Sequence, residues 1–126
     1  MRSDAERLAD ILDAAHKIAI KVSDGQDAFM RDEYVQLALG HLVQIIGEAA
    51  GRLSKDVTDR NPDIPWHQII AMRNRVVHGY FDVDAGILWT VVSVDVPTLA
   101  AQIKATWTAS ELPAHQGSRQ DVIDLQ

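Results

Sequence analysis

The sequence contains no cysteine, and this absence removes several kinds of chemistry at once. Disulfides, thiolate metal sites and cysteine nucleophiles are excluded, and the absence fits a reducing compartment. The five histidines show no ligand spacing such as His-Glu-x-x-His, so we expect neither a metal site nor a cofactor. The chain also lacks a P-loop, a dinucleotide-binding glycine pattern and a nucleophile elbow.

Long apolar runs are missing as well. No run approaches the length needed to cross a bilayer, and the charged residues 1–6 lack the apolar core of a signal peptide. We therefore expect a soluble, cytoplasmic protein with no membrane contact. The net charge of −6 argues against non-specific nucleic-acid binding, but it leaves room for a local basic cleft.

At 126 residues the chain has the length of one domain, and 47% of its residues are hydrophobic, enough for a sizeable core. Apolar residues recur at helical spacing, and no pair of strands is indicated. We predict an all-α fold, a compact antiparallel bundle of about five helices within residues 1–110, followed by a mobile tail over 111–126. The expected helices span about 3–22, 32–53, 65–79, 85–92 and 95–110.

Local signals support the first two helices. Ser3 and Glu6 have the spacing of a capping box, which predicts a helix start. Gly40, Gly47 and Gly51 line up on one side of the second helix. Interior glycines cost about 1 kcal/mol each relative to alanine, so this line predicts close approach by another backbone. We expect a homodimer to bury the glycine-lined face or one beside it.

The most informative segment is the octet of residues 73–80, Arg-Asn-Arg-Val-Val-His-Gly-Tyr. Arg73 can grip a phosphate with its planar fork of donors, and His78 can move a proton near neutral pH. The Tyr80 hydroxyl can contact or accept a phosphoryl group. Together these groups are suited to cutting RNA without a metal.

Each of these residues also has a purely structural interpretation. Arg73 falls where the helix pattern favours an apolar residue, so it either pairs with an acid or lines a cleft. The acid that the spacing offers is Glu48 on the second helix, and such an ion pair is compatible with a phosphate contact. His78 alone is typical of a helix end, and Tyr80 alone is typical of packing against Phe81.

The spacing of the octet bears on assembly. In an ideal helix His78 lies about 140° around from Arg73, so the two groups converge only if the helix ends near residue 79 or a second copy supplies the facing half. Both routes favour a cleft in a dimer over a pocket inside one subunit.

The octet resembles the Arg-x4-His-x-Tyr motif of HepT-like ribonuclease toxins, minimal members of the HEPN superfamily. Further segments resemble that family's landmarks in the same order, and the resemblance covers about residues 4–108. The landmark segments are residues 46–50, 62–66, 72–74 and 96–99.

This resemblance implies a dimerising helical bundle with metal-independent endoribonuclease activity and growth-inhibiting toxicity. It implies that Arg73 and His78 are catalytic, that Asn74 is the supporting polar residue after the arginine, and that Tyr80 is the modification site. The partner it implies is an MNT-type nucleotidyltransferase antitoxin, which neutralises the toxin by transferring AMP onto the tyrosine. Glu48 is our additional supporting residue, on the strength of the predicted ion pair.

Two alternatives to an RNA-cleaving enzyme remain open. The chain could be a non-catalytic helical subunit that binds a nucleotidyltransferase or a nucleotide. The octet could also be only an ion-paired structural corner of a dimer. The sequence does not identify which RNA would be cut or what residues 111–126 contribute.

Overall fold

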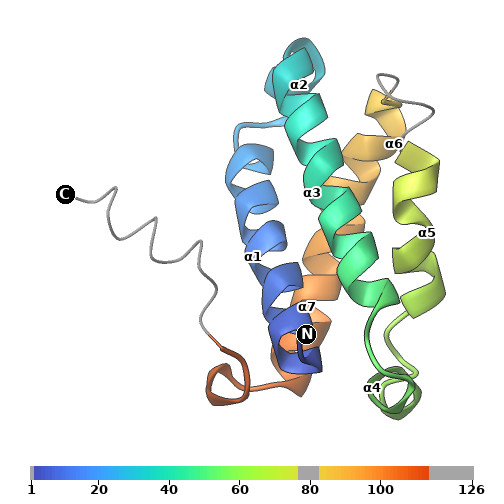
Figure 1. Cartoon of the computed structure of the whole chain (residues 1–126). Coiled ribbons are helices and arrows are strands. Elements are labelled where there is room, and N and C mark those ends of the chain that lie inside the picture. Colours follow the sequence, from blue (N-terminus) through green and yellow to red (C-terminus); the bar gives the residue numbers. More distant parts are fainter. Residues whose placement is uncertain (1, 77–82, 114–126) are drawn as a thin grey trace.

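The computed structural model describes residues 2–76 and 83–113, and every regular element in those ranges is helical (Figure 1). The prediction of an all-α bundle is therefore confirmed. The elements are α1 (Asp4–Val22), α2 (Gln26–Arg31), α3 (Glu33–Gly51), α4 (Lys55–Arg60), α5 (Trp66–Val76), α6 (Ala85–Thr90), the π-helical η1 (Val91–Asp95), α7 (Val96–Thr106) and the short 3-10 helix η2 (Ala109–Glu111).

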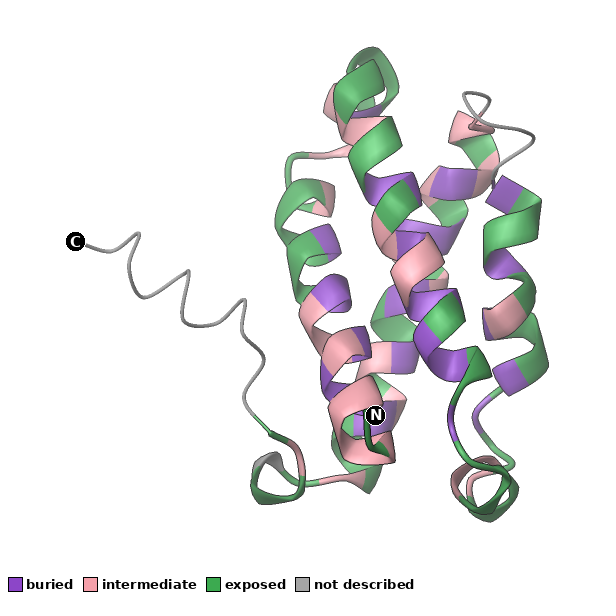
Figure 2. Cartoon of the chain, in the orientation of Figure 1, coloured by how far each residue is buried: buried purple, intermediate pink, exposed green. Residues whose placement is uncertain are grey.

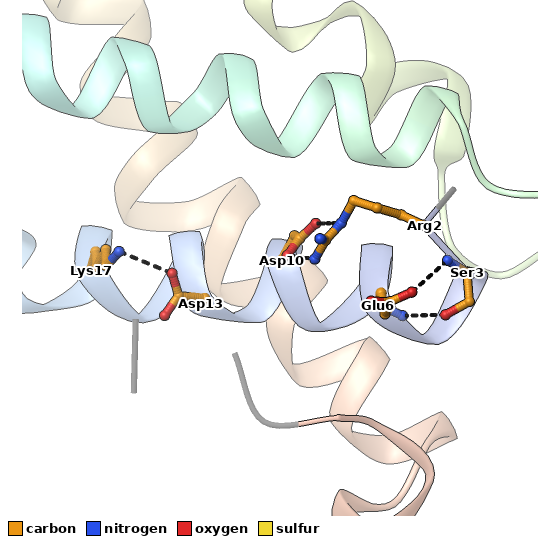
Figure 3. Close-up of polar contacts among 6 residues, drawn as sticks. All are labelled: Arg2, Ser3, Glu6, Asp10, Asp13 and Lys17. Carbon is orange, nitrogen blue, oxygen red and sulfur yellow. Dashed lines mark hydrogen bonds and ion pairs between the residues drawn. The ribbon is translucent and has the colours of Figure 1, made fainter. Parts of the chain in front are cut away.

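The predicted capping box starts α1. The Ser3 hydroxyl accepts a hydrogen bond from the Glu6 backbone N–H at 3.1 Å, and the Ser3 backbone N–H donates to the Glu6 carboxylate at 2.9 Å (Figure 3). These two bonds satisfy backbone groups that a helix start otherwise leaves unpaired. The side chains of Asp32 and Ser54 cap α3 and α4, each by accepting one backbone hydrogen bond.

The core lies between α1, α3, α5 and the run from α6 to α7, which stand side by side in Figure 1. Figure 2 shows that the buried residues lie on the helix faces that point toward one another. The fully buried large side chains come from all four of these segments: Leu8, Ile11, Ile18, Leu39, Val43, Ile46, Val76, Leu88, Val91, Val92, Leu99 and Ile103. Their burial from water is the main favourable contribution to folding.

The last two predicted helices are one continuous helix over Ala85–Thr106, so the predicted break near residue 93 is wrong. In a regular α-helix Pro97 would clash with the carbonyl four residues earlier. Here η1 widens the helix just before the proline, and the Val96 N–H bonds to the Val91 carbonyl five residues back. A π turn of this kind lets the helix continue past Pro97.

This continuous helix also corrects the expectation about membrane-spanning runs. It is 22 residues long and contains an apolar stretch of mean hydropathy 1.4, so by length and composition alone it could cross a bilayer. In the structure it forms one wall of the core, and a third of its apolar stretch is buried inside the bundle. Packing into the bundle therefore accounts for part of its apolar character.

The remaining differences lie in the connections. The six-residue helix α4 occupies the link between α3 and α5, where no helix was predicted. Beyond α7, the described chain continues to Pro113, and Leu112 packs against the core. The predicted mobile tail otherwise lies outside the described residues, because residues 114–126 are not described.

The glycine line on α3 serves contacts within this chain. A Cβ on Gly47 would lie 3.5 Å from the Ile70 carbonyl oxygen and 3.7 Å from that of Ile69, so the backbone of α5 does pass close to α3 there. Gly40 faces the Val83 side chain, and Gly51 faces the Ile70 side chain. The predicted backbone approach is thus confirmed at Gly47, and the glycines give no separate evidence for a second copy.

We predict that the size of the residue at position 47 sets the stability of the α3–α5 contact. Gly47→Ala fits at ordinary contact distance and should be neutral or stabilise by up to about 1 kcal/mol through helix propensity. Gly47→Leu must displace the α5 backbone and should cost roughly 1–3 kcal/mol. Urea unfolding measures both. Gly51→Leu is the control, since it meets only flexible Ile70 carbons at 3.9 Å and beyond; equal effects at the two positions would contradict the contact.

A second prediction concerns Asp4, which joins the start of α1 to the start of α4. Its carboxylate accepts from the Ser54 hydroxyl at 2.6 Å and from the Ser54 N–H at 2.9 Å. These two bonds, the hydroxyl first, hold the pKa of Asp4 below its usual 3.8. The folded pKa is the lower one, so this stabilisation is present above the unfolded pKa and is lost as pH falls through the folded value.

Asp4→Asn should therefore reduce the free energy of unfolding by about 1 kcal/mol at neutral pH, a modest figure because the carboxylate is partly exposed. The difference from wild type should shrink below pH 4 and vanish in stronger acid. Urea unfolding across this pH range is the measurement. Asp59→Asn, which removes an exposed pair with Lys55, should change stability by no more than about 0.5 kcal/mol. A pH-independent loss in Asp4→Asn would refute the assignment.

Candidate active site

The structure describes the first four residues of the octet and not the rest. Arg73, Asn74, Arg75 and Val76 form the last turn of α5. His78 and Tyr80, the predicted general acid–base and modification sites, lie outside the described residues, so their roles stay predictions. The site can be built from Arg73, Asn74 and Glu48.

Arg73 and Glu48 form the predicted ion pair between α5 and α3. Arg73 Nη1 lies 3.6 Å from Glu48 Oε1, and the two side chains are 44% and 58% exposed. At this exposure the pair contributes at most about 1 kcal/mol to stability. Its geometric effect is to place the cationic head of Arg73 beside a carboxylate at the surface of α3 and α5.

Gly47 explains how Arg73 reaches Glu48. A Cβ on Gly47 would lie 3.8 Å from Arg73 Cδ, so the aliphatic stem of the arginine passes over the glycine. Its guanidinium then meets the carboxylate of the next residue on α3. The helix pattern placed Arg73 at a position where an apolar residue is expected. In the structure its aliphatic stem packs against α3 there, while the charged guanidinium stays in solvent.

Asn74 and Arg75 complete the exposed polar end of α5. Successive residues are about 100° apart on a helix, so Arg75 points away from the Arg73 side, toward the α6–α7 side. Neither Asn74 nor Arg75 has a side-chain hydrogen bond or an ion pair to any other part of residues 2–76 and 83–113. The negative end of the helix dipole favours the two arginines at this position.

Both ends of the stretch 77–82 are anchored in the bundle. The Asp84 N–H donates to the Val76 carbonyl at 2.8 Å, so the chain returns to the point where α5 ends. Val83 then packs beside Gly40 on α3. The described residues that flank 77–82 therefore lie beside the end of α5, the helix turn that carries Arg73.

The charged side chains of the site suit anion binding better than metal binding. Within the described ranges, no group of three or more His, Asp or Glu side chains could hold a metal ion. An exposed guanidinium oriented by a carboxylate can instead form a bidentate contact with a phosphate. The arrangement of Glu48 behind Arg73 was predictable, while the part played by Gly47 was missed, although it directly precedes Glu48 in the sequence.

Comparisons with known proteins agree on one family. The model of the family described as "Ribonuclease HepT-like" matches residues 11–106. The chain is 33% identical over 104 residues to "Probable ribonuclease HepT" of Thermococcus cleftensis, covering 82% of this chain and 94% of that protein. It is 30% identical over 98 residues to "Putative RNase MJ1380" of Methanocaldococcus jannaschii, covering 77% and 90%.

A search of solved structures gave no match. The family match includes α3 and α5 in full, and with them Glu48, Arg73 and the whole octet. Both relatives are matched over nine tenths or more of their own length. This chain belongs to the Ribonuclease HepT-like family.

Proposed function

We propose that this protein is the endoribonuclease toxin of a HEPN/MNT toxin–antitoxin system and that it cleaves RNA without a metal. The family and the names of its relatives support ribonuclease activity. The observation that carries the proposal is the exposed Arg73 guanidinium, packed over Gly47 and oriented by Glu48. We place the protein in the cytoplasm, where RNA and a partner enzyme are available.

In the proposed reaction the ribose 2′-OH attacks the adjacent phosphorus. The bond to the 5′-oxygen breaks, which leaves a 2′,3′-cyclic phosphate and a 5′-hydroxyl. One proton leaves the 2′-OH and one is delivered to the 5′-oxygen, and His78 serves as base or acid. Arg73 stabilises the charge that develops on the phosphate oxygens. Asn74 supports the site as the exposed polar neighbour of Arg73.

We propose that the working site is a cleft between two copies of the chain. The Arg73–Glu48 pair lies on an open surface of α3 and α5, where one copy alone gives water free access. A facing copy would supply a second arginine and a second histidine, so that acid and base can come from different subunits. It would also exclude water, which strengthens the interaction of arginine with phosphate.

We predict that wild-type protein cleaves RNA in EDTA and that His78→Ala reduces the rate by about 10²–10⁴-fold, as for other general acid–base groups. Replacing the scissile 2′-OH by hydrogen should abolish cleavage, because the nucleophile is then missing. Gel assays with end-labelled RNA measure both, and sedimentation should show the active species as a dimer. His16→Ala, an exposed histidine on α1, is the matched control.

Dependence on added magnesium would rule out the proposed chemistry. A folded wild-type protein that cleaves no RNA, but binds a nucleotidyltransferase, would favour the alternative of a non-catalytic helical binding subunit.

We further predict that Glu48 acts by positioning Arg73. Glu48→Gln should change the free energy of unfolding by no more than about 1 kcal/mol, because the pair is exposed. It should lower kcat by roughly tenfold while leaving KM nearly unchanged, if the arginine acts mainly on the transition state. Glu48→Asp should recover part of the rate. The matched control is Glu33→Gln, an exposed glutamate in the first turn of α3. An unchanged kcat would reduce the pair to a structural role.

The final prediction concerns control by the proposed antitoxin. AMP on the Tyr80 hydroxyl would bring a phosphate and a nucleoside to the end of the bundle that carries Arg73, and would exclude RNA by volume and like charge. Co-expression with the cognate MNT-type nucleotidyltransferase should add one or more AMP masses, seen by intact-mass spectrometry. Tyr80→Phe should keep at least part of the nuclease activity and escape neutralisation. The control Tyr34→Phe changes an exposed tyrosine on α3 and should still be neutralised. Full neutralisation without added mass would indicate simple sequestration instead.

A further inference from the structure

A hollow lies on the opposite side of α5 from the Arg73–Glu48 pair. It has a cavity volume of about 460 Å³ and lies between α5 and the junction of η1 with α7. Its apolar lining includes Ile69 and Met72 from α5 with Val94 and Leu99 from the continuous helix, and its polar lining includes Arg75 and Asp95. The volume falls within the range of small-molecule sites, which often lie between the helices of a bundle.

The apolar part of this hollow, which we call the slot, has a buried floor and an exposed edge. Ile69, Met72 and Leu99 are buried, and they form a firm floor. Val94 is 55% exposed, so an apolar side chain stands in solvent at the edge of the same hollow. A flat apolar ligand that lay against the floor and covered Val94 would remove this surface from water.

Two charges line the slot without neutralising one another. Within the described part of the chain, neither Arg75 nor Asp95 forms an ion pair or a side-chain hydrogen bond, although both line the same cavity. Asp95 is half-buried, and a half-buried carboxylate with no donor is unfavourable. A ligand that carries an anionic group and an N–H edge would satisfy both side chains.

The π turn explains why Asp95 is available to such a ligand. Val94 and Asp95 belong to η1, where the helix is widened by one residue ahead of Pro97. The widening changes the direction in which residues of this segment point, and π turns occur frequently at functional sites. Two lining residues of the slot therefore come from an irregular segment.

We infer that this slot binds a nucleobase of the RNA substrate, and that guanine is the base it fits best. A base supplies the flat apolar face, and its nucleotide phosphate supplies the anion for Arg75. Guanine presents two parallel N–H donors to one carboxylate, which matches Asp95, whereas uracil presents a single one. The inference rests on the proposed ribonuclease function for its ligand, and it assigns a base preference to that function.

The position on α5 connects the slot to the proposed site. Arg73 and Arg75 belong to the same last turn of α5, and they lie about 200° apart around the helix. An RNA strand that crosses the end of α5 can meet Arg73 on the α3 side and Arg75 on the α7 side. A base of that strand can then reach the slot.

The test is calorimetric titration of the full-length protein with GMP and with UMP, in EDTA at low salt. GMP should bind at least about tenfold more tightly than UMP, the scale of a good bidentate base contact. Asp95→Asn should remove most of that preference, because the amide offers one acceptor instead of two. Arg75→Gln should weaken both nucleotides by similar factors, since both carry the phosphate.

Val94→Trp tests the location, because the larger side chain fills the mouth of the slot and should abolish GMP binding. Ile20→Trp is its matched control, an equally exposed branched residue at 54% on α1. Circular dichroism establishes that each variant is folded. Equal affinity for the two nucleotides, or no GMP binding at millimolar concentration, overturns the inference. The inference is also overturned if Val94→Trp binds GMP as tightly as wild type. If that variant keeps GMP binding but no longer forms a dimer, the slot is instead a contact with a second copy.

The titration is independent of RNA cleavage, so the two proposals can fail separately. If GMP binds in the slot but no RNA is cut, the ribonuclease proposal fails and the slot stands. If RNA is cut and GMP does not bind, the slot proposal fails and the ribonuclease proposal stands. Where both succeed, the cleavage sites in a mixed-sequence RNA should favour guanine in wild type and lose that preference in Asp95→Asn.

Discussion

The close approach of α5 to α3 at Gly47 is the contact on which the site depends. It brings the Ile69 and Ile70 carbonyls within van der Waals distance of the position where any other residue would carry a Cβ. The same approach lays the stem of Arg73 across α3, so that its head meets Glu48. A wider spacing would separate the ion pair and leave the guanidinium without a fixed direction. Packing inside the bundle therefore sets the geometry of a group at its surface.

Features that depend on residues close in sequence were predicted well. The capping box at Ser3 and Glu6 is a local hydrogen-bond pattern, and the structure contains it as predicted. The Glu48–Arg73 pair was one of two compatible interpretations of an arginine at an apolar helix position, and the structure contains it. Glu48 and Arg73 are farther apart in the sequence than Ser3 and Glu6.

Features that depend on tertiary packing were predicted less well. Residues 95–97, Asp-Val-Pro, have the local pattern of a helix start. In the bundle Val91, Val92 and Val96 are all buried, and one helix continues through this segment. The short α4 has no apolar periodicity to reveal it, although Ser54 is a recognisable N-cap. His78 and Tyr80 lie outside the described residues, so the fold neither supports nor opposes their predicted roles.

The distribution of charge gives the proposed function its main physical constraint. The chain has a net charge of −6, so its average field repels RNA, and binding must come from a few well-placed cations. Arg73 and Arg75 lie at the C-terminal end of α5, where the helix dipole makes their charges favourable even without a ligand. Few phosphate contacts imply weak, salt-sensitive affinity. Under that constraint, a protein that acts on selected RNAs gains most from contacts to bases, because these discriminate between sequences without requiring a basic surface.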